Sequence, residues 1–312
     1  MSNAEHLANV MVQAFIDAVE NGVDLVPVVA DSTSTAKIAP FVKKFPGRLV
    51  NVGIAEQSLV GTAAGLALGG KVAVTCNAAP FLISRANEQV KVDVCYNNTN
   101  VKLFGLNAGG SYGPLASTHH SIDDLSVMRG FGNIQIFAPS SPRECRQIID
   151  YAISYQGPVY IRMDGKALPE LYDEGYQFTP GDIVTLREGK EIALVATGST
   201  VHEIVEAADM LEQSGIRVKV ISVPSIRPCD TGALYAELKD CSAVITVEEH
   251  NINGGLGSLV AEVISEAGAP VKVKRLGIPD GEYAAASDRK FLRHYHGFDA
   301  ESIASLATSL LK

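Results

Sequence analysis

The sequence is poor in the features that mark several classes of protein. Among 312 residues there are only five cysteines, an odd number with no C-x-x-C pair. We therefore expect reduced, buried or incidental thiols and neither a zinc nor an iron–sulfur site. No apolar run approaches the roughly 18–20 residues of a membrane-spanning helix. The N-terminal stretch lacks the basic and apolar regions of a signal peptide, so we expect a cytoplasmic protein without membrane contact.

Positive charge is also scarce. Lys and Arg number 26 against 35 Asp and Glu, which gives a formal charge of −9 and a pI near 5.3. This balance argues against nucleic acid and against anionic membrane surfaces as partners, although a local basic pocket for a phosphate stays possible. The 46% of hydrophobic residues is typical of a globular protein, and the length suits two domains.

Apolar bursts alternate with helical patterns through the first half of the chain. The expected strands are 25–30, 48–52, 71–75, 101–106, 134–138 and 158–162, and the expected helices are 3–20, 55–68, 82–95 and 142–155. The last helix has clear start signals, with Ser141 as N-cap, Pro142 at its first position and Glu144 in its first turn. Near-continuous apolar strands separated by helices indicate a parallel sheet covered on both faces.

The character of the chain changes at 164–190, where Gly, Pro and charged residues dominate. A second alternation follows, with strands at 191–196, 216–223, 243–249 and 271–277 and helices at 200–214, 231–239 and 256–267. We predict an α/β protein with a first domain at 1–165, a linker at 166–185 and a smaller α/β domain at 186–312.

Glu56 stands out in "NVGIAEQSLVG" (51–61), an otherwise small and apolar segment. One interpretation is an acid favourably placed at a helix N-terminus, and another is an exposed first-turn charge. The third is a carboxylate buried at a subunit interface, where desolvation raises its pKa and lets it share a proton with a ligand nitrogen.

Two further segments follow expected strands, where ligands bind in open α/β sheets. Phe81 is either a core residue or a flat face for an aromatic ring. The Gly-rich stretch 107–121 carries His119 and His120, which either cap a helix or contact a substrate oxygen near neutral pH. A third segment, "HNINGGLGSLVAE" (250–262), is compatible with a phosphate turn or, more simply, with close helix–strand packing.

Several segments, in this order, resemble the C-terminal half of thiamine-diphosphate enzymes of the transketolase and deoxyxylulose-phosphate synthase type. They are 45–68, 80–91, 117–130, 137–149, 157–165 and 248–262. The family's N-terminal half carries a Gly-Asp-Gly…Asn motif for the magnesium diphosphate, and the chain contains no such segment. The resemblance therefore implies a pyrimidine-binding domain of the thiamine-diphosphate fold followed by a transketolase C-terminal domain, in one subunit of a split transketolase.

The resemblance also implies roles for individual residues. Glu56 matches the glutamate that bonds the cofactor's aminopyrimidine, and Phe81 matches a ring that packs against it. His119 matches a histidine that contacts the donor's oxygens, which makes Glu56 and His119 the expected catalytic residues. Asp31 matches an acidic position near the cofactor, and Arg162 matches a substrate-binding arginine. The partner, an N-terminal subunit, would hold the diphosphate and Mg2+, with a homodimer core inside a heterotetramer.

The sequence departs from the transketolase pattern where the sugar is recognised. Leu115 replaces an expected Asp and Asn107 an expected His, while Ser84 and Asn87 replace further aromatic positions. Lys166 is the nearest cation where a second Arg is expected. We therefore expect ketol transfer between sugars or sugar phosphates with altered donor recognition.

Other functions on the same scaffold stay open from the sequence. A deoxyxylulose-phosphate synthase-like fragment and the β subunit of a 2-oxoacid dehydrogenase are the nearest alternatives. A non-catalytic scaffolding subunit is a third, although the retained Glu56, Phe81 and His119 argue against it.

Overall fold

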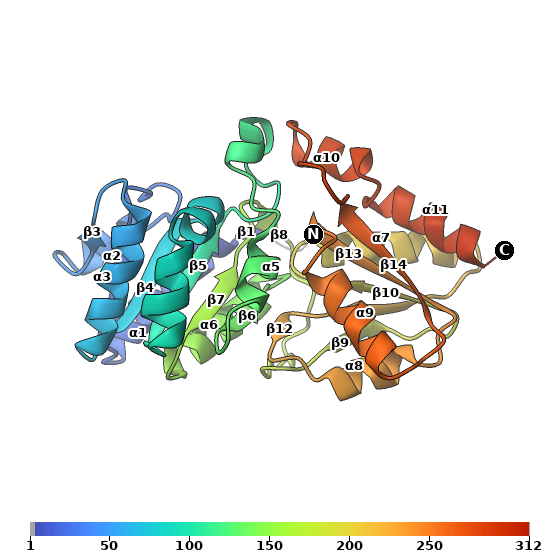
Figure 1. Cartoon of the computed structure of the whole chain (residues 1–312), viewed down its shortest axis with the longest axis horizontal. Helices are drawn as coiled ribbons and strands as arrows, with labels where there is room; N and C mark the ends of the chain where they lie inside the picture. Colours follow the sequence, from blue (N-terminus) through green and yellow to red (C-terminus); the bar gives the residue numbers. More distant parts are fainter. Residues whose placement is uncertain (1–3, 312) are drawn as a thin grey trace.

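The computed structural model describes residues 4–311 and contains two main sheets joined side by side (Figure 1). The larger sheet has the strand order β12-β6-β7-β5-β4-β2-β3. Its strands are β2 (Leu25–Val29), β3 (Val50–Asn51), β4 (Val72–Ala78), β5 (Val101–Leu106), β6 (Gln135–Phe137), β7 (Val159–Arg162) and β12 (Ser225–Arg227). All neighbouring pairs are parallel except β12 with β6, so the predicted parallel sheet is confirmed apart from this edge strand.

Helices cover both faces of the larger sheet, as predicted. The helices α1 (Leu7–Glu20), α2 (Ala39–Lys44) and α6 (Pro142–Ser154) enclose one apolar cluster that includes Phe15, Phe41 and Ile148. The helices α3 (Glu56–Leu68) and α5 (Asp124–Arg129) and the segment 81–96 bury the other face. The N-terminus of α6 is confirmed, because the Ser141 hydroxyl accepts a hydrogen bond of 3.3 Å from the Glu144 amide.

Two predicted helices differ from the structure. Glu5–His6 form a short strand, β1, that pairs antiparallel with β8 (Ala167–Leu168), so the first helix begins at Leu7 rather than at residue 3, which lies outside the described residues. The helix predicted at 82–95 is divided into η1 (Phe81–Arg85), α4 (Asn87–Gln89) and η2 (Val90–Tyr96). Both η segments are π-helical, a geometry that is often found at functional sites.

The smaller sheet has the order β14-β13-β10-β11-β9. Its strands are β9 (Val184–Arg187), β10 (Ile192–Ala196), β11 (Lys219–Ser222), β13 (Ala243–Asn251) and β14 (Lys272–Ile278), parallel except for β9. Helices α7 (Thr200–Gln213) and α11 (Ala300–Leu310) bury one face, and α8 (Thr231–Leu238) and α9 (Leu256–Glu266) bury the other. The helix α10 (Arg289–Tyr295) precedes α11 and lies beside the larger sheet's loops (Figure 1).

The segment between the two sheets packs on the first domain. Tyr176 donates a hydrogen bond of 2.8 Å to the buried Glu144 in α6, and its ring stacks on Tyr172 at 4.0 Å between centroids. One apolar cluster also runs through both halves of the chain, from Leu125 and Met128 to Leu256 and Val260. The domain limits predicted from the sequence stay a prediction, but the two sheets are tied firmly to each other.

Among residues 4–311, none of the helices combines the length and apolar character that crossing a membrane requires.

Candidate active site

The candidate site lies at the carboxyl ends of β3, β4 and β5. Three segments follow these strands: the start of α3 with Glu56, the turn with Phe81, and the loop 107–121 with both histidines. Because β5, β4 and β2 are neighbours and β3 lies next to β2, the parallel strands deliver these segments to one edge of the sheet.

Glu56 is a buried carboxylate, with only 3% of its surface exposed. The exposed-charge interpretation of this residue is therefore wrong. Arg85 in η1 donates to its Oε2 at 2.6 Å, and the side-chain amide of Asn77, near the end of β4, lies 3.4 Å from its Oε1. Arg85 also lines the cavity described below, so the buried carboxylate is connected to the cavity through this arginine.

Phe81 is half-buried at the start of η1 and is one wall of the site. The Arg85 guanidinium lies 4.8 Å from the centre of its ring. The His119 ring packs edge-on at 5.2 Å between centroids, so the structure brings Phe81 and His119 together as the sequence predicts for a shared site.

The loop 107–121 is closed at its base and holds both histidines. Gly109 and Ser121 exchange two backbone hydrogen bonds of 2.9 Å. His119 is half-buried, with Nδ1 at 2.9 Å from the Thr118 hydroxyl. His120 is buried, and its Nε2 bonds the Gly113 carbonyl at 2.9 Å, so Nε2 must carry the proton. Burial lowers the pKa of His120, and the neutral ring keeps its Nδ1 as an acceptor.

A cavity of ≈ 420 Å³ lies over these residues. It is lined by Pro80, Phe81, Ser84, Arg85, Ser117, Thr118, His120, Ile122, Asp123 and Tyr283. The lining thus combines a cation, a carboxyl group, several hydroxyl groups, a histidine and two aromatic rings. Burial, together with the neighbouring Asp124, raises the pKa of the Asp123 carboxyl group. A small polar molecule with an anionic group matches this chemistry.

Of the five predicted site residues, Phe81 lines the cavity itself. Glu56 and His119 contact the lining residues Arg85 and Phe81, and Arg162 and Asp31 lie farther away. Arg162 is buried, with its Nε at 2.9 Å from Asp124 and its Nη2 donating to the carbonyls of Ser121 and Glu249 at 3.2 and 2.8 Å. In this chain it ties β7 to the loop base and to the second domain. Asp31 is exposed after β2, with a left-handed φ of 65° and its amide 3.2 Å from Asn51 Oδ1.

The sequence interpretation missed two residues of the site. Arg85 contacts Glu56 and Phe81, and its spacing of four from Phe81 within a helical segment is a signal that could have found it. Tyr283 reaches the cavity from the second domain, some 160 residues after His119 in the chain, and no local pattern indicates it.

In the glycine-rich turn at 250–262, a side chain of the protein occupies the position that a phosphate would take. The buried Glu248 carboxylate accepts hydrogen bonds from the amides of Leu256 and Gly257 at 2.7 and 2.8 Å, at the start of α9. A Cβ on Gly257 would lie 2.8 Å from the Thr246 hydroxyl. The phosphate-turn interpretation is therefore wrong, and close helix–strand packing explains these glycines.

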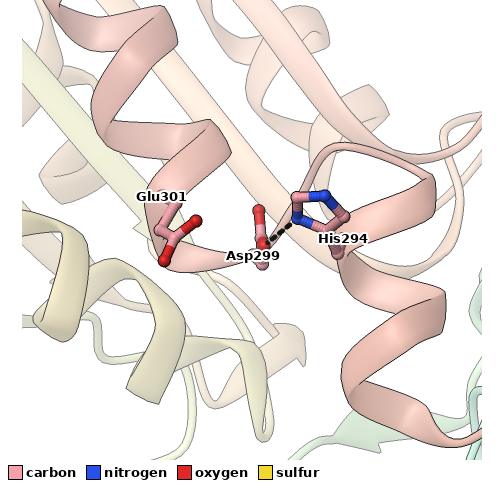
Figure 2. Close-up of side chains that lie close together, drawn as sticks. All are labelled: His294, Asp299 and Glu301. Carbon is pink, nitrogen blue, oxygen red and sulfur yellow. Dashed lines mark hydrogen bonds and ion pairs between the residues drawn. The ribbon is translucent and has the colours of Figure 1, made fainter.

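His294, Asp299 and Glu301 form a group whose donor atoms lie within 4.8 Å of one another (Figure 2). Asp299 already uses both oxygens, since Oδ1 accepts from the Ser302 amide at 3.1 Å and Oδ2 lies 2.7 Å from His294 Nδ1. The N-terminus of α11 also disfavours a cation. Capping of α11 explains this group without a metal ion.

Comparison with known proteins agrees with this geometry. Residues 6–170 match the family model of the transketolase pyrimidine binding domain, and residues 181–303 match that of the transketolase C-terminal domain. The chain belongs to the transketolase family and corresponds to the C-terminal subunit of a split, thiamine-diphosphate-dependent transketolase.

The relatives include separate subunits and longer single chains. An apulose-4-phosphate transketolase subunit from Actinobacillus succinogenes is 77% identical and covers 99% of this chain and 100% of its own length. A 1-deoxy-D-xylulose-5-phosphate synthase of Heliobacterium modesticaldum is 34% identical over 92% of this chain but only 44% of its own. A structure described as a split gene transketolase, inactive beta4 tetramer, is 34% identical, with a TM-score of 0.88 over 99% of both chains.

The site residues fit the pyrimidine end of thiamine diphosphate. Glu56 offers a buried carboxylate and Phe81 a ring face at one edge of the sheet. Asn77 is fully buried beside Glu56, and its Oδ1 has no hydrogen-bond partner among the described residues. An unsatisfied buried acceptor is costly unless a donor such as an amino group reaches it, so the donor set matches an aminopyrimidine.

Proposed function

We propose that this chain catalyses ketol transfer from a sugar-phosphate donor, with apulose 4-phosphate as the donor, as the C-terminal half of a two-subunit transketolase. The support is the 77% identity to the Actinobacillus succinogenes protein over the full length of both chains, together with one cavity that gathers Phe81, Arg85 and His120. We also propose a cytoplasmic location, in keeping with the reduced cysteines expected from the sequence.

Each predicted residue has a proposed task. Thiamine diphosphate supplies a carbanion-stabilising centre when it is bound, and the protein supplies placement and electrostatics. Glu56, buried at the start of α3, shares a proton with the aminopyrimidine. Phe81 packs against the pyrimidine, and His119 orients or protonates a donor oxygen beside it. Asp31 lies at the same edge of the sheet and would need the assembled enzyme to approach the cofactor.

The cavity suggests how a phosphorylated sugar is held. Arg85 supplies a guanidinium, and Ser84, Ser117 and Thr118 supply hydroxyl donors in the same lining. Guanidinium and hydroxyl groups are good partners for a phosphate. We assign Arg162 to positioning the loop base in place of substrate binding, because its donors are engaged with Asp124 and two carbonyl groups.

We propose that an N-terminal subunit completes the site and holds the diphosphate and Mg2+, around a homodimer core within a heterotetramer. Large apolar side chains are exposed on α3, on η2 and in the turn before α3, where packing on another chain would bury them: Leu68, Val92, Tyr96 and Ile54. Exposed apolar patches of this kind mark interaction sites.

The test is reconstitution with the partner subunit, loaded with thiamine diphosphate and Mg2+. We expect ketol transfer with apulose 4-phosphate at a kcat/KM well above that for fructose 6-phosphate. Faster turnover of pyruvate would favour a deoxyxylulose-phosphate synthase-like or 2-oxoacid dehydrogenase-like function. Failure of every donor in a correctly assembled complex would favour the scaffolding function.

A further inference from the structure

Residues 109–121 of the loop, which include both histidines, pack closely against the second domain. In Figure 1 this loop, in green, rises beside α10. Three of its glycines approach the second domain so closely that a Cβ would clash: Gly109 with Glu249 at 2.6 Å, Gly110 with Leu292 at 2.6 Å and Gly113 with the Ser287 carbonyl at 2.9 Å.

One polar contact defines the register of this docking. The amide of Gly110 donates a hydrogen bond of 2.8 Å to Oε1 of Glu249, a side chain on β13 with 2% of its surface exposed. Gly110 directly follows Gly109, which pairs with Ser121 at the base of the loop. The hydrogen bond to the buried carboxylate therefore fixes the position of the chain where the loop begins.

The Glu249 carboxylate is itself immobilised. Arg289 donates to both of its oxygens, at 2.7 and 3.0 Å, and Arg293 donates to Oε2 at 2.7 Å. Burial alone would raise the pKa of Glu249, but Arg289 and Arg293 outweigh it and hold the pKa to about 2. The carboxylate therefore stays charged through the physiological pH range. Its hydrogen bonds to two arginines hold the Glu249 side chain in a single position.

Arg162 connects the C-terminal end of the loop to β13. Its Nη2 donates to the backbone carbonyls of Ser121, at the end of the loop, and of Glu249. The amide of Asn251, also on β13, donates to the Ile122 carbonyl at 2.7 Å. Both ends of the loop are thus bonded to β13 within three residues of each other.

We infer that Glu249 is a positioning residue for ketol transfer, and that the second domain sets the places of His120, which lines the cavity, and of His119, which packs on Phe81, through the Glu249–Gly110 contact. This inference rests on the proposed function, because His119 is assigned to the donor. Misplacement of a catalytic group by about 1 Å can cost up to 10²-fold in rate.

Gly110→Val tests this inference, because its side chain must enter the space of Leu292 and lift the loop. In the assembled enzyme we expect the KM of the donor to rise about tenfold or more, while the Kd of thiamine diphosphate changes less than twofold. Leu292→Ala in the same chain makes room for the valine and should recover most of the loss. The control is Gly257→Ala, which crowds Thr246 and Arg275 away from the loop and should leave KM unchanged.

Hydrogen–deuterium exchange on the full chain without its partner measures how well the loop amides are protected, independently of activity. Gly110→Val and Glu249→Gln should both speed exchange within 109–121, and Leu292→Ala should restore protection to the valine variant. An unchanged donor KM, a parallel loss of cofactor affinity or absence of rescue would overturn the inference. If no donor turns over but the exchange pattern is as expected, the proposed function fails while the docking stands.

Discussion

At the scale of single residues, the contact between Arg85 and Glu56 has the clearest functional consequence. The guanidinium occupies Glu56 Oε2 at 2.6 Å and covers the Phe81 ring, which is the space assigned to the aminopyrimidine. The Arg85 side chain is nearly half exposed while Glu56 is buried, so the arginine is the member of the pair that has room to move. If Glu56 and Phe81 bind the aminopyrimidine as proposed, we expect the cofactor to displace this arginine from Glu56, and a phosphate in the cavity can then bind it.

Arg85→Gln removes this competitor for Glu56. We expect the affinity of the assembled enzyme for thiamine diphosphate to rise a few-fold and the KM of a phosphorylated donor to rise as well. Titration calorimetry measures the first effect and steady-state kinetics the second, with Arg85→Lys as the charge-conserving control. A weaker cofactor affinity in Arg85→Gln would show that Arg85 contributes to the cofactor site rather than competing for it.

Lys102 is a second residue with an unusual environment. Its ammonium group on β5 is fully buried and donates to Asn100 Oδ1 and to the carbonyls of Tyr155 and Gly157 at 2.6–2.7 Å, with no acid among these partners. Burial lowers its pKa to about 7. Above pH 7 the folded chain therefore binds fewer protons than the unfolded chain, so this group makes stability rise with pH.

Lys102→Met removes this dependence. Relative to the variant, the free energy of unfolding of the wild type should rise between pH 7 and pH 9, by at most about 1.4 kcal/mol per pH unit. Urea denaturation at several pH values measures the difference, with the exposed Lys43 changed to Met as the control. Parallel pH profiles for wild type and Lys102→Met would contradict the assignment.

The residue scale also shows what the sequence can predict. Glu56, Phe81 and His119 are identifiable because each follows an expected strand in a recognisable segment, and the structure gathers them at one edge of the sheet. Arg85 and Tyr283 are not predicted from the sequence, because their positions depend on a π-helical turn and on contacts between domains, respectively. The family resemblance implies substrate binding for Arg162, but Asp124 and the Glu249 carbonyl, both remote in sequence, engage its donors.

At the scale of helices and strands, the positions are predictable to within a few residues, since apolar periodicity fixes them. The exceptions arise from tertiary contacts. Glu5–His6 extend because they pair with Ala167–Leu168, and the segment 81–96 becomes π-helical around the site. The edge strand β12 joins a sheet of the other domain, a pairing that no local pattern encodes.

Glu248 controls the start of α9 through its bonds to the amides of Leu256 and Gly257. Glu248→Ala leaves both donors buried without a partner, so we expect a loss of about 2 kcal/mol or more in the free energy of unfolding. Glu248→Gln keeps one acceptor and should lose less. Urea denaturation measures both variants, and equal stability of wild type and Glu248→Ala would contradict this account of the glycine-rich turn.

At the scale of the whole molecule, the exposed apolar side chains on α3 and η2 are the expected contact with other subunits. Leu68 is 73% exposed and Tyr96 is 86% exposed. A glutamate at either position puts a charge into the proposed interface, where desolvation opposes assembly. We expect Leu68→Glu and Tyr96→Glu to prevent formation of the complex while the isolated chain keeps its melting temperature.

Analytical ultracentrifugation with the partner subunit measures this assembly. Tyr295→Glu is the control, because it places the same charge at an exposed tyrosine of the second domain. Full assembly of both interface variants would show that the subunits meet elsewhere on the chain.

The most direct measurement of the central claim is turnover of the reconstituted enzyme with Glu56→Gln. Glutamine keeps the shape of the buried side chain and cannot share the proton, so we expect kcat to fall by at least about 10²-fold. The complex should still assemble and still bind thiamine diphosphate. A Glu56→Gln enzyme that retains more than about a tenth of wild-type turnover, with cofactor bound, would contradict the assignment of Glu56 as the residue that activates the cofactor.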